Sequence, residues 1–270
     1  MKIIVITGAS DGIGAEMARQ LARREGADVG LVLAARDERK LGEVSDHCQA
    51  LGARVLVVRM DVSVEAECRQ LINAAVAHFG RLDALINNAG MSAQALFEDV
   101  KATDLAWYEQ LMRINFWGSV WCTHAALPFL KQSHGAIVAV SSLAGLIGVP
   151  GRTAYCATKF AMTGFFEALR TELKSAGISV TTAYPGVVAT NIRHHGFNAA
   201  GVAAGSSGLK EDNAMRVGTC AALILQGMDR REREVVMTSK GKLGRWLKLF
   251  APSTVEAMAL AALKDEVKPH

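Results

Sequence analysis

The segment Lys2-Ile3-Ile4-Val5-Ile6-Thr7-Gly8-Ala9-Ser10-Asp11-Gly12-Ile13-Gly14 decides the fold. Its apolar, β-branched start predicts a buried strand over residues 2–7, and a helical pattern follows to about Arg24. The glycines between them are spaced differently from the G-x-G-x-x-G fingerprint. Their physical use is the same, because a tight turn brings backbone amides at a helix N-terminus close to a pyrophosphate. We therefore predict a dinucleotide-binding turn at the start of the chain.

Short apolar strands and helices alternate beyond this turn. Strands are expected at 29–34, 54–58, 84–86 and 136–140, with a helix near 37–51 and one long helix from Asp104 to Leu130. Ser63 is a candidate N-cap for the helix after the third strand. Such alternation implies right-handed crossovers and a parallel sheet with helices on both faces. The predicted fold class is α/β, a doubly wound parallel sheet (Rossmann fold) in a single domain over residues 1–270.

Composition agrees with this class. The chain has 270 residues, of which 50% are hydrophobic, so it can bury a large core, and its net charge of +4 gives no case for nucleic acid as the main partner. Five scattered cysteines without a C-x-x-C pair indicate free thiols in a reducing compartment. The apolar run before Gly8 is too short for a signal peptide, and no run reaches transmembrane length. We expect a cytoplasmic protein.

The end of the second strand predicts which dinucleotide binds. Where NAD-binding folds place an acidic residue for the ribose 2′-hydroxyl, this chain has Ala34-Ala35-Arg36, with Arg39 and Lys40 one turn later. Arg36 can pair with a 2′-phosphate through its planar fork. Asp11 points the other way if it lies near that phosphate, although it can also serve only as the helix N-cap. The sequence favours NADP(H) over NAD(H).

A second cluster, Ser141-Ser142 followed by Tyr155-x-x-x-Lys159, carries acid–base chemistry. Tyr155 and Lys159 lie on one face if their segment is helical, and Ser142 follows the strand at 136–140. A phenol beside a fixed cation has its pKa lowered and becomes a usable proton donor or acceptor. Tyr-x-x-x-Lys alone is a weak signal, and an ordinary surface helix explains it equally well.

Together these motifs resemble the short-chain dehydrogenase/reductase family. The residues that carry the resemblance occur in the family's order and spacing over about residues 1–190: the glycine turn from Thr7 to Gly14, Asn87-Asn88-Ala89-Gly90, Asn115, Ser142, Tyr155-x-x-x-Lys159 and Pro185-Gly186. The C-terminal extension at 239–270 resembles the hydroxysteroid-dehydrogenase-like branch, which handles lipophilic carbonyls and alcohols. The resemblance makes the catalytic interpretation of Tyr155 and Lys159 the stronger one.

The resemblance implies a role for each residue. Tyr155 would be the acid or base, Lys159 would hold the nicotinamide ribose and lower the phenol's pKa, and Ser142 rather than Ser141 would bond to the reacting oxygen. Asn115, which alone reads as a buried asparagine bonded to backbone, would add a water link to Lys159. The implied cofactor-binding residues are Gly8, Ser10, Asp11, Gly12, Ile13, Gly14, Arg36, Asp61, Val62, Asn88, Ala89, Gly90, Tyr155, Lys159, Pro185, Gly186, Val188 and Thr190. Thr190 could otherwise cap a following helix.

Residues 191–214 differ from this core of 1–190. They are rich in Gly, Ala and Ser, which is typical of a mobile loop, and their position after the nicotinamide contacts predicts a substrate lid. His194-His195 lies here without nearby carboxylate or cysteine partners, so we expect these side chains to face solvent or to line the substrate site, and no metal is assigned.

The tail predicts a basic amphipathic helix. Leu243, Trp246, Leu247 and Phe250 recur at helical spacing, with Lys242, Arg245 and Lys248 between them. Such a helix can cover the substrate pocket or a subunit interface, which we favour, or contact a membrane peripherally. Pro252 is expected to end it, and Ser253-x-x-Glu256 to form a capping box for a second helix. The helices near 104–130 and 155–175 pair subunits in many family members, which implies a homodimer or homotetramer.

The leading hypothesis is an NADP-dependent oxidoreductase acting on a ketone or secondary alcohol, an apolar or lipid-like small molecule. The alternative is a non-catalytic NADP-binding regulator or scaffold, which loss of Tyr155 or Lys159 would have favoured.

Overall fold

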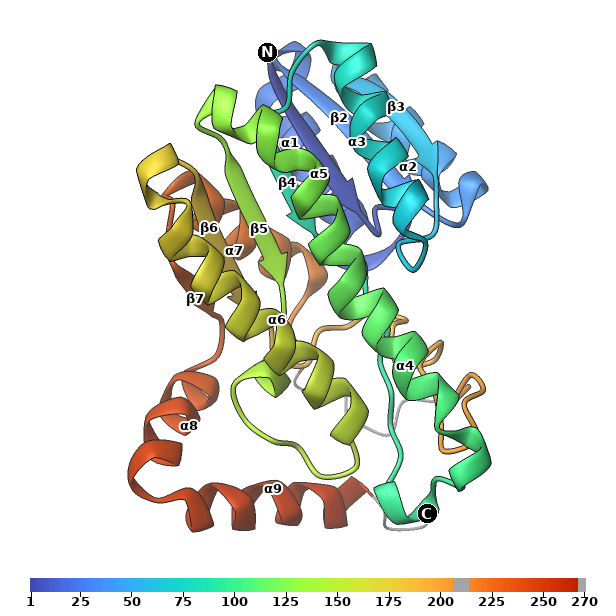
Figure 1. Ribbon diagram of the computed structural model, residues 1–270, viewed down its shortest axis with the longest axis vertical. Coiled ribbons are helices and arrows are strands. Elements are labelled where there is room, and N and C mark those ends of the chain that lie inside the picture. Colours follow the sequence, from blue (N-terminus) through green and yellow to red (C-terminus); the bar gives the residue numbers. More distant parts are fainter. Residues whose placement is uncertain (206–213, 267–270) are drawn as a thin grey trace.

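A seven-stranded, all-parallel sheet forms the centre of the molecule (Figure 1). The computed structural model describes residues 1–205 and 214–266. The strands lie in the order β3-β2-β1-β4-β5-β6-β7. Their bounds are β1 Lys2–Thr7, β2 Val29–Ala35, β3 Arg54–Arg59, β4 Ala84–Asn87, β5 Ala136–Val140, β6 Ser179–Tyr184 and β7 Glu234–Val236. The expected doubly wound sheet in one domain is confirmed.

Helices cover both faces of the sheet because each crossover returns the chain to a parallel strand. The helices α1, α2 and α7 pack on one face, and α3, α5 and α6 on the other (Figure 1). The helix bounds are α1 Gly12–Glu25, α2 Glu38–Ala50, α3 Glu65–Phe79, α4 Ala106–Met112, α5 Gly118–Ser133, α6 Thr153–Glu172, α7 Val217–Asp229, α8 Ser239–Phe250 and α9 Pro252–Glu266. No described helix has both the length and the apolarity needed to cross a bilayer.

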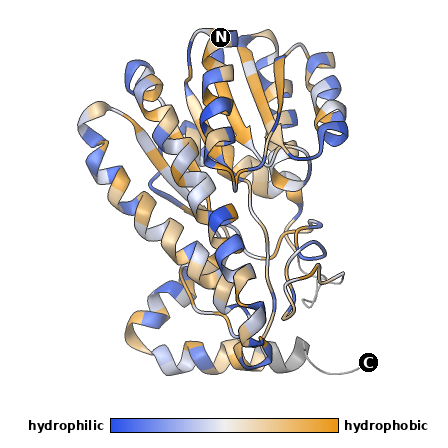
Figure 2. Cartoon of the chain, turned by 45° about the vertical axis from the view of Figure 1, so that its right-hand side comes forward, coloured by the Kyte–Doolittle hydropathy of each residue, from blue (hydrophilic) through white to orange (hydrophobic). Residues whose placement is uncertain are grey.

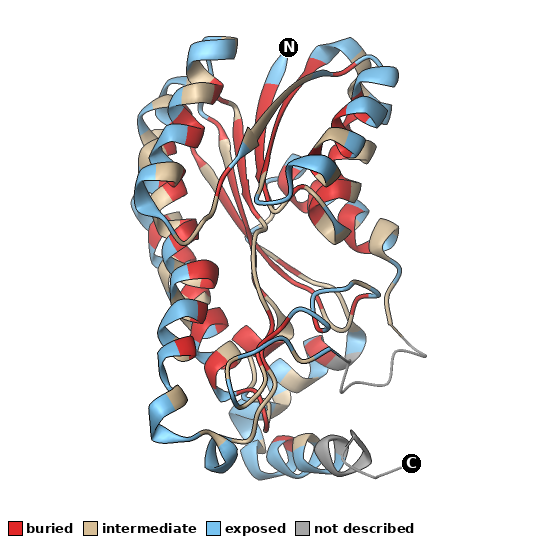
Figure 3. Cartoon of the chain, turned by 90° about the vertical axis from the view of Figure 1, so that its right-hand side faces the viewer, coloured by how far each residue is buried: buried red, intermediate tan, exposed pale blue. Residues whose placement is uncertain are grey.

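The core is split by the sheet into two apolar clusters, which explains why the central strands are apolar on both sides. Alternate residues of β1 belong to opposite clusters: Ile4 and Ile6 face α1 and α7, whereas Ile3 and Val5 face α3 and α5. Figure 2 shows these strands as hydrophobic, and Figure 3 shows them as buried. The two layers hold the carboxyl ends of the strands in fixed positions.

The topological switch point lies between β1 and β4. From β1 the chain proceeds outward through β2 and β3, and then returns to β4 on the other side. Loops after the two central strands therefore diverge, which leaves a crevice at their carboxyl ends. The glycine turn follows β1 and Asn88 follows β4, so both expected nucleotide-binding segments border this crevice.

The long helix expected from Asp104 to Leu130 is wrong in one detail. The helical segment runs from Ala106 to Ser133, but Arg113–Trp117 forms a π-helical turn between α4 and α5. A π turn inserts one extra residue without breaking the helix, so hydrophobic periodicity does not reveal it. Asn115 lies within this turn.

Two expected helix caps are also wrong. Val64, not Ser63, precedes α3, and the Ser63 amide instead donates to the Asp61 carboxylate at 2.8 Å. Pro252 opens α9 rather than simply ending α8, so Ser253 lies inside the first turn and cannot be the N-cap. Proline suits a first helical position because its missing N–H would have no partner there.

The segment 191–205 has turns and isolated bridges but no regular helix or strand, as expected of the loop. Its remaining residues up to 213 lie outside the described part. Thr190 is not followed by a helix, so the capping alternative for it is excluded.

Candidate active site

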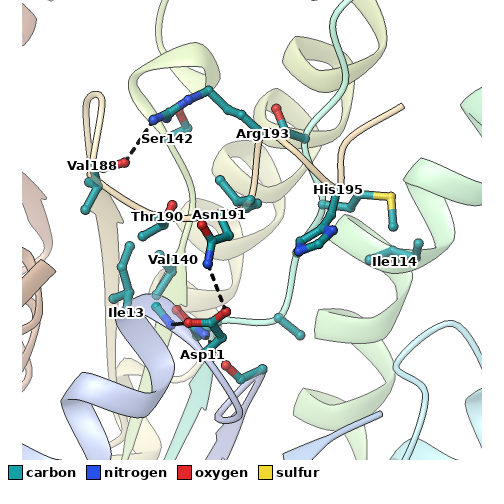
Figure 4. A pocket seen from close by; sticks show the side chains of 18 of the residues that line it. Asp11, Ile13, Ile114, Val140, Ser142, Val188, Thr190, Asn191, Arg193 and His195 are labelled. Atoms are coloured by element: carbon teal, nitrogen blue, oxygen red, sulfur yellow. Dashed lines mark hydrogen bonds between the residues drawn. The ribbon is translucent and has the colours of Figure 1, made fainter. Parts of the chain in front are cut away.

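A cavity of about 650 Å³ opens at the switch point (Figure 4). Of the predicted site residues, all but Gly14 and Asn115 line it. The cavity runs from the end of β2, past the glycine turn, to the start of α6 and the loop after β6. Its size suits a dinucleotide together with part of a small molecule.

The glycine turn needs its glycines for two reasons. Gly8 and Gly12 have φ of +66° and +55°, a region that disfavours other residues. At Gly14 an added Cβ would lie 2.3 Å from the Gly8 carbonyl oxygen and 2.5 Å from Asn88 Nδ2. The first turn of α1 therefore packs directly on the loop after β4, and the helix N-terminus faces the cavity.

Asp11 caps α1, as the sequence allowed, by accepting a hydrogen bond from the Gly12 amide at 2.7 Å. Its other oxygen accepts from Lys40 Nζ at 3.2 Å and from Asn191 Nδ2 at 3.5 Å. Burial would raise the pKa of Asp11, but these bonds and the Lys40 charge outweigh it and lower the pKa. The carboxylate thus both caps α1 and binds Lys40 on α2.

Arg36 is exposed at the end of β2 and lines the cavity with Asp37 and Lys40. Asp37 caps α2 by accepting from the Lys40 amide at 3.0 Å, which fixes where the first turn of that helix begins. Two cations, Arg36 and Lys40, therefore line the cavity where β2 ends. Lys40 was noted from the sequence only as a basic residue one turn after Arg36, and no site role was predicted for it.

Asp61 and Val62 lie at the same end, after β3. The Asp61 amide donates to Glu67 Oε2 at 2.7 Å, which ties this loop to α3. A Cβ added at Gly118 would lie 2.7 Å from the Val62 carbonyl oxygen. The loop is thereby held between α3 and α5 and lines the cavity.

Asn88 joins β4 to β1. Its Nδ2 donates to the carbonyl oxygens of Thr7 at 3.0 Å and Gly8 at 3.2 Å. The Thr7 hydroxyl in turn accepts from the amides of Asn88 and Ala89. Besides any contact with a ribose, Asn88 therefore fixes the glycine turn in place.

Ser141 and Ser142 have different surroundings. Ser141 Oγ is buried and donates to the Lys159 carbonyl oxygen at 3.2 Å, which ties β5 to α6. Ser142 Oγ accepts from the Ala144 amide at 3.2 Å, caps a short 3-10 turn and lies at the cavity (Figure 4). The geometry favours Ser142 as the residue that faces a bound molecule.

Tyr155 lies in the first turn of α6 and lines the cavity. Burial raises the pKa of its phenol, whereas a hydrogen bond with Ser142 and the charges of Arg152 and Arg193 oppose that rise. The net direction is upward, in contrast to the lowering expected from Lys159. Lys159 Nζ lies 5.8 Å from the centre of the Tyr155 ring, and burial is the larger effect.

Lys159 is buried, and its Nζ donates to the Val140 carbonyl oxygen at 3.0 Å. Burial lowers the pKa of this ammonium to about 8. A Cβ added at Gly90 would lie 3.6 Å from Nζ and 3.2 Å from Asn115 Oδ1, so the loop after β4 passes close to both side chains.

Asn115 is fully buried behind the cavity. Its Oδ1 accepts from the Met91 amide at 2.7 Å, while Nδ2 donates to the Met91 carbonyl oxygen at 2.9 Å and to Thr158 Oγ1 at 3.0 Å. The bonding to backbone that the residue alone suggested is therefore present. It also connects the π turn to α6, one residue before Lys159.

Several lining residues were missed by sequence reasoning. They are Met91, Ser92, Ile114, Val149, Arg152 and Arg193. His195 lines the cavity as well, which is one of the two positions expected for it. Arg152 is buried and donates to Ser92 Oγ and Gln94 Oε1, both at 3.3 Å. Arg193 donates to the Val188 carbonyl oxygen at 3.2 Å (Figure 4). Arg152, three residues before Tyr155, could have been suspected from that spacing on a helix.

The arrangement fits a nicotinamide dinucleotide. Glycines at positions where a Cβ would clash let the backbone come close to a bound molecule. The N-terminus of α1 offers backbone amides to that molecule, and the cations Arg36 and Lys40 lie where β2 ends. A phenol, a hydroxyl and an ammonium gather at the other end. A doubly wound fold with this site defines an NAD(P)-dependent oxidoreductase.

Comparison with known proteins gives the family. A model of the family described as short chain dehydrogenase matches residues 2–200, and this chain belongs to the short-chain dehydrogenase/reductase family. It is similar to 11-beta-hydroxysteroid dehydrogenase A of Sesamum indicum, with 38% identity over 94% of this chain and 73% of that protein. It is also similar to 11-beta-hydroxysteroid dehydrogenase-like 2 of Arabidopsis thaliana, with 35% identity over 100% of this chain and 84% of that one.

Solved structures agree. A short-chain dehydrogenase/reductase from Burkholderia phymatum in complex with NAD has a TM-score of 0.80 and 26% identity, covering 94% of each chain. An alcohol dehydrogenase from Thermococcus sibiricus complexed with 5-hydroxy-NADP has a TM-score of 0.73 and 22% identity, covering 88% of this chain and 96% of that one. The second likeness is one of fold.

Proposed function

We propose that this enzyme transfers a hydride between C4 of NADP(H) and the carbonyl carbon of an apolar ketone or the corresponding secondary alcohol. The observation that carries the proposal is the meeting of Ser142, Tyr155 and Lys159 in one cavity with the glycine turn and Arg36. The enzymatic class follows from the family. The preference for NADP(H), the apolar substrate and the roles of these residues are what we propose.

The cofactor would be held along the whole cavity. Arg36 and Lys40 would face the 2′-phosphate, Asp61 and Val62 the adenine, and Asn88 to Gly90 the ribose and phosphate path. Pro185, Gly186, Val188 and Thr190 would border the carboxamide. When bound, the nicotinamide supplies the hydride chemistry.

The chain itself supplies the proton. Tyr155 Oη donates its proton to the reacting oxygen in reduction and takes it back in oxidation, with Ser142 Oγ bonded to that oxygen as charge develops. Burial keeps the phenol protonated, which suits the donating role. Lys159, with its pKa near 8, can hold or release a proton at neutral pH and would pass it toward solvent beside Asn115.

The substrate is proposed to be apolar. The two relatives compared above carry the name 11-beta-hydroxysteroid dehydrogenase, which points to a rigid lipophilic substrate class. Trp107 and Phe197 pack together where the loop at 191–205 meets α4, with ring centres 5.7 Å apart. That contact supports a role for the loop as a lid over the part of the cavity where the substrate would bind. Polar residues that line this part of the cavity would orient the substrate.

Tyr155→Phe tests the mechanism. The variant keeps the ring and loses the proton, so we expect turnover of ketones with NADPH to fall at least about a thousandfold. NADPH affinity should change little, which binding-induced fluorescence checks. Ser142→Ala should lose about a hundredfold, since only one hydrogen bond to the reacting oxygen is removed. Essentially unchanged turnover in Tyr155→Phe would refute this mechanism.

We also propose that two or four copies assemble through α5 and α6, in the cytoplasm. Trp117 is 43% exposed and stacks on Trp121, with ring centres 5.8 Å apart, and Phe160 on α6 is 38% exposed. These exposed aromatic residues, at the N-cap of α5 and on α6, support an interface on the sheet face that α3, α5 and α6 cover.

A further inference from the structure

The last two helices carry a large exposed apolar surface. Their outward side chains are 50–82% exposed: Leu243, Trp246, Leu249, Phe250, Met258 and Leu260, called here the C-terminal patch. Scattered exposed apolar residues are ordinary, but six large ones on two consecutive helices mark a surface that is covered in use. Figure 3 shows this end of the molecule as mostly exposed, and Figure 2 shows apolar residues on it.

The patch is not the face that packs on the protein. Helix α8 turns Gly241, Gly244 and Leu247 inward. A Cβ added at Gly241 would lie 2.5 Å from Leu143 Cδ2, and one at Gly244 would lie 2.8 Å from Ile147 Cδ1. Small residues thus let α8 lie close against the segment after Ser142. Leu243, Trp246 and Phe250 point outward and do not line the cavity, so of the expected roles for this helix the cover over the pocket is not theirs.

Charge identifies what the patch faces. Residues 239–250 contain four Lys or Arg and no Asp or Glu. Lys242 is exposed within the apolar surface. Lys248 Nζ donates to the Leu146 carbonyl oxygen at 3.0 Å and lies 4.9 Å above the Phe160 ring. Arg245 is paired with Glu234. A basic helix with Trp, Phe and Leu outward has the composition of helices that lie in an anionic membrane surface.

A second copy of the chain fits less well. In a two-fold symmetric pair each patch meets itself, so Lys242 would face the partner's basic helix. Like charges across a closed apolar contact oppose association. The lipid headgroup layer avoids the contact between two basic helices, because a phosphate can meet Lys242 while the aromatic rings enter the interfacial region.

We propose that α8 and α9 dock this enzyme on the surface of an anionic bilayer, with Trp246, Leu249 and Phe250 inserted and Lys242 bonded to lipid phosphate. The proposal does not depend on the enzyme's substrate or cofactor. Since α8 contacts Leu143, which lines the cavity, docking also places the substrate end of the site beside the lipid.

Co-sedimentation of the purified full chain with vesicles tests the proposal. One set is neutral phosphatidylcholine, and in the other part of it is replaced by anionic phosphatidylglycerol. We expect stronger partition into the anionic set and a blue shift of tryptophan emission. Trp246→Ala/Phe250→Ala should lower that partition about tenfold or more, because two buried aromatic contacts are lost. Lys242→Glu should lower it several-fold and keep Trp246.

Controls separate the patch from general surface properties. Arg69→Glu makes the same charge change on α3, where Arg69 is 63% exposed, and should partition like the wild type. Light scattering of each variant gives the oligomeric state. No partition of the wild type into anionic vesicles would overturn the proposal, as would equal partition into both vesicle sets. So would an unchanged double variant, or one that dissociates into smaller assemblies, which would show that a second copy covers the patch.

Discussion

Lys159 illustrates how one residue can be costly for folding. The residue is 3% exposed, and burial lowers the pKa of its ammonium from 10.5 to about 8. The folded state therefore binds fewer protons than the unfolded state between those two values. Stability from this group rises with pH across that window, and below about pH 8 the full cost of burying the charge is present.

Lys159→Met should therefore stabilise the fold. At pH 7 we expect a gain in the free energy of unfolding of up to about 3 kcal/mol, reduced by the lost bond to Val140. Above the unfolded pKa both states are neutral and the gain should disappear. Denaturant titrations at neutral and high pH measure it, with Lys131→Met on the exposed side of α5 as control. A variant less stable than wild type at pH 7 would contradict this.

Arg36 and Asp11 should have opposite effects on cofactor choice. Arg36→Ala removes a partner for the 2′-phosphate, so NADP affinity should fall roughly tenfold to a hundredfold with NAD affinity little changed. Asp11→Asn keeps the helix cap but removes a negative charge that holds Lys40 at 3.2 Å. NADP should then bind several-fold more tightly. Calorimetric titration of both cofactors measures this, and a wild-type preference for NAD would refute the role of Arg36.

The residues of the site were predictable where their spacing is fixed by a strand or a helix. Ser142, Tyr155 and Lys159 follow β5 or lie on α6, and they reach the cavity together. Arg193 was not predictable as a cavity residue, because an irregular segment brings it there and no periodicity reports the path of that segment. The upward pKa of Tyr155 was missed because sequence shows a neighbouring cation but not the depth of burial.

At the scale of elements, the contact of α1 with the loop after β4 gives a sharp test. Gly14→Ala places a methyl group 2.3 Å from a backbone oxygen, so we expect a loss of about 3 kcal/mol or more in unfolding free energy and much weaker cofactor binding. Gly164→Ala in the middle of α6 meets nothing within 4 Å and should stabilise the fold by about 0.5–1 kcal/mol. Thermal and urea unfolding of both variants compare them. Equal effects would contradict the packing described.

Element boundaries show the limits of local signals. The five strands predicted from the sequence, β1 to β5, were located within about a residue because their apolar runs end sharply at polar loops, whereas β6 and β7 were not predicted. The π turn at Asn115 was not predicted, since the segment stays helical through it and no glycine or proline within Arg113–Trp117 marks it in the sequence. Ser253-x-x-Glu256 matches the sequence pattern of a capping box. Because α9 already begins at Pro252, Ser253 lies inside the helix and cannot be its N-cap.

At the scale of the whole molecule, the alternation of strands and helices was sufficient to predict the sheet, because crossover handedness leaves few arrangements. The exposed apolar surfaces, one on α8 and α9 and the other at α5 and α6, were not predictable. Which side of α8 faces inward depends on how Gly241 and Gly244 fit the segment at 143–147, and this is a tertiary contact without a sequence pattern.

Trp117→Arg tests the assembly. If α5 and α6 form the interface, a charge at this exposed aromatic position should shift the protein toward monomer, seen by light scattering. Cofactor binding should persist because Trp117 does not line the cavity. Trp246→Ala is the matched control and should leave the oligomer intact. An unchanged oligomer in Trp117→Arg would place the interface elsewhere.

The carboxylate of Asp11 has a consequence that reaches across the molecule. It contacts Lys40 on α2 and Asn191 at the start of the loop at 191–205, so it is shared by two segments for which we propose different ligands. A phosphate that draws Lys40 away leaves Asp11 free to bond more strongly to Asn191. Binding at the adenosine end would then favour one arrangement of the loop, and by reciprocity a substrate that holds the loop in that arrangement tightens the enzyme's grip on the cofactor by the same factor.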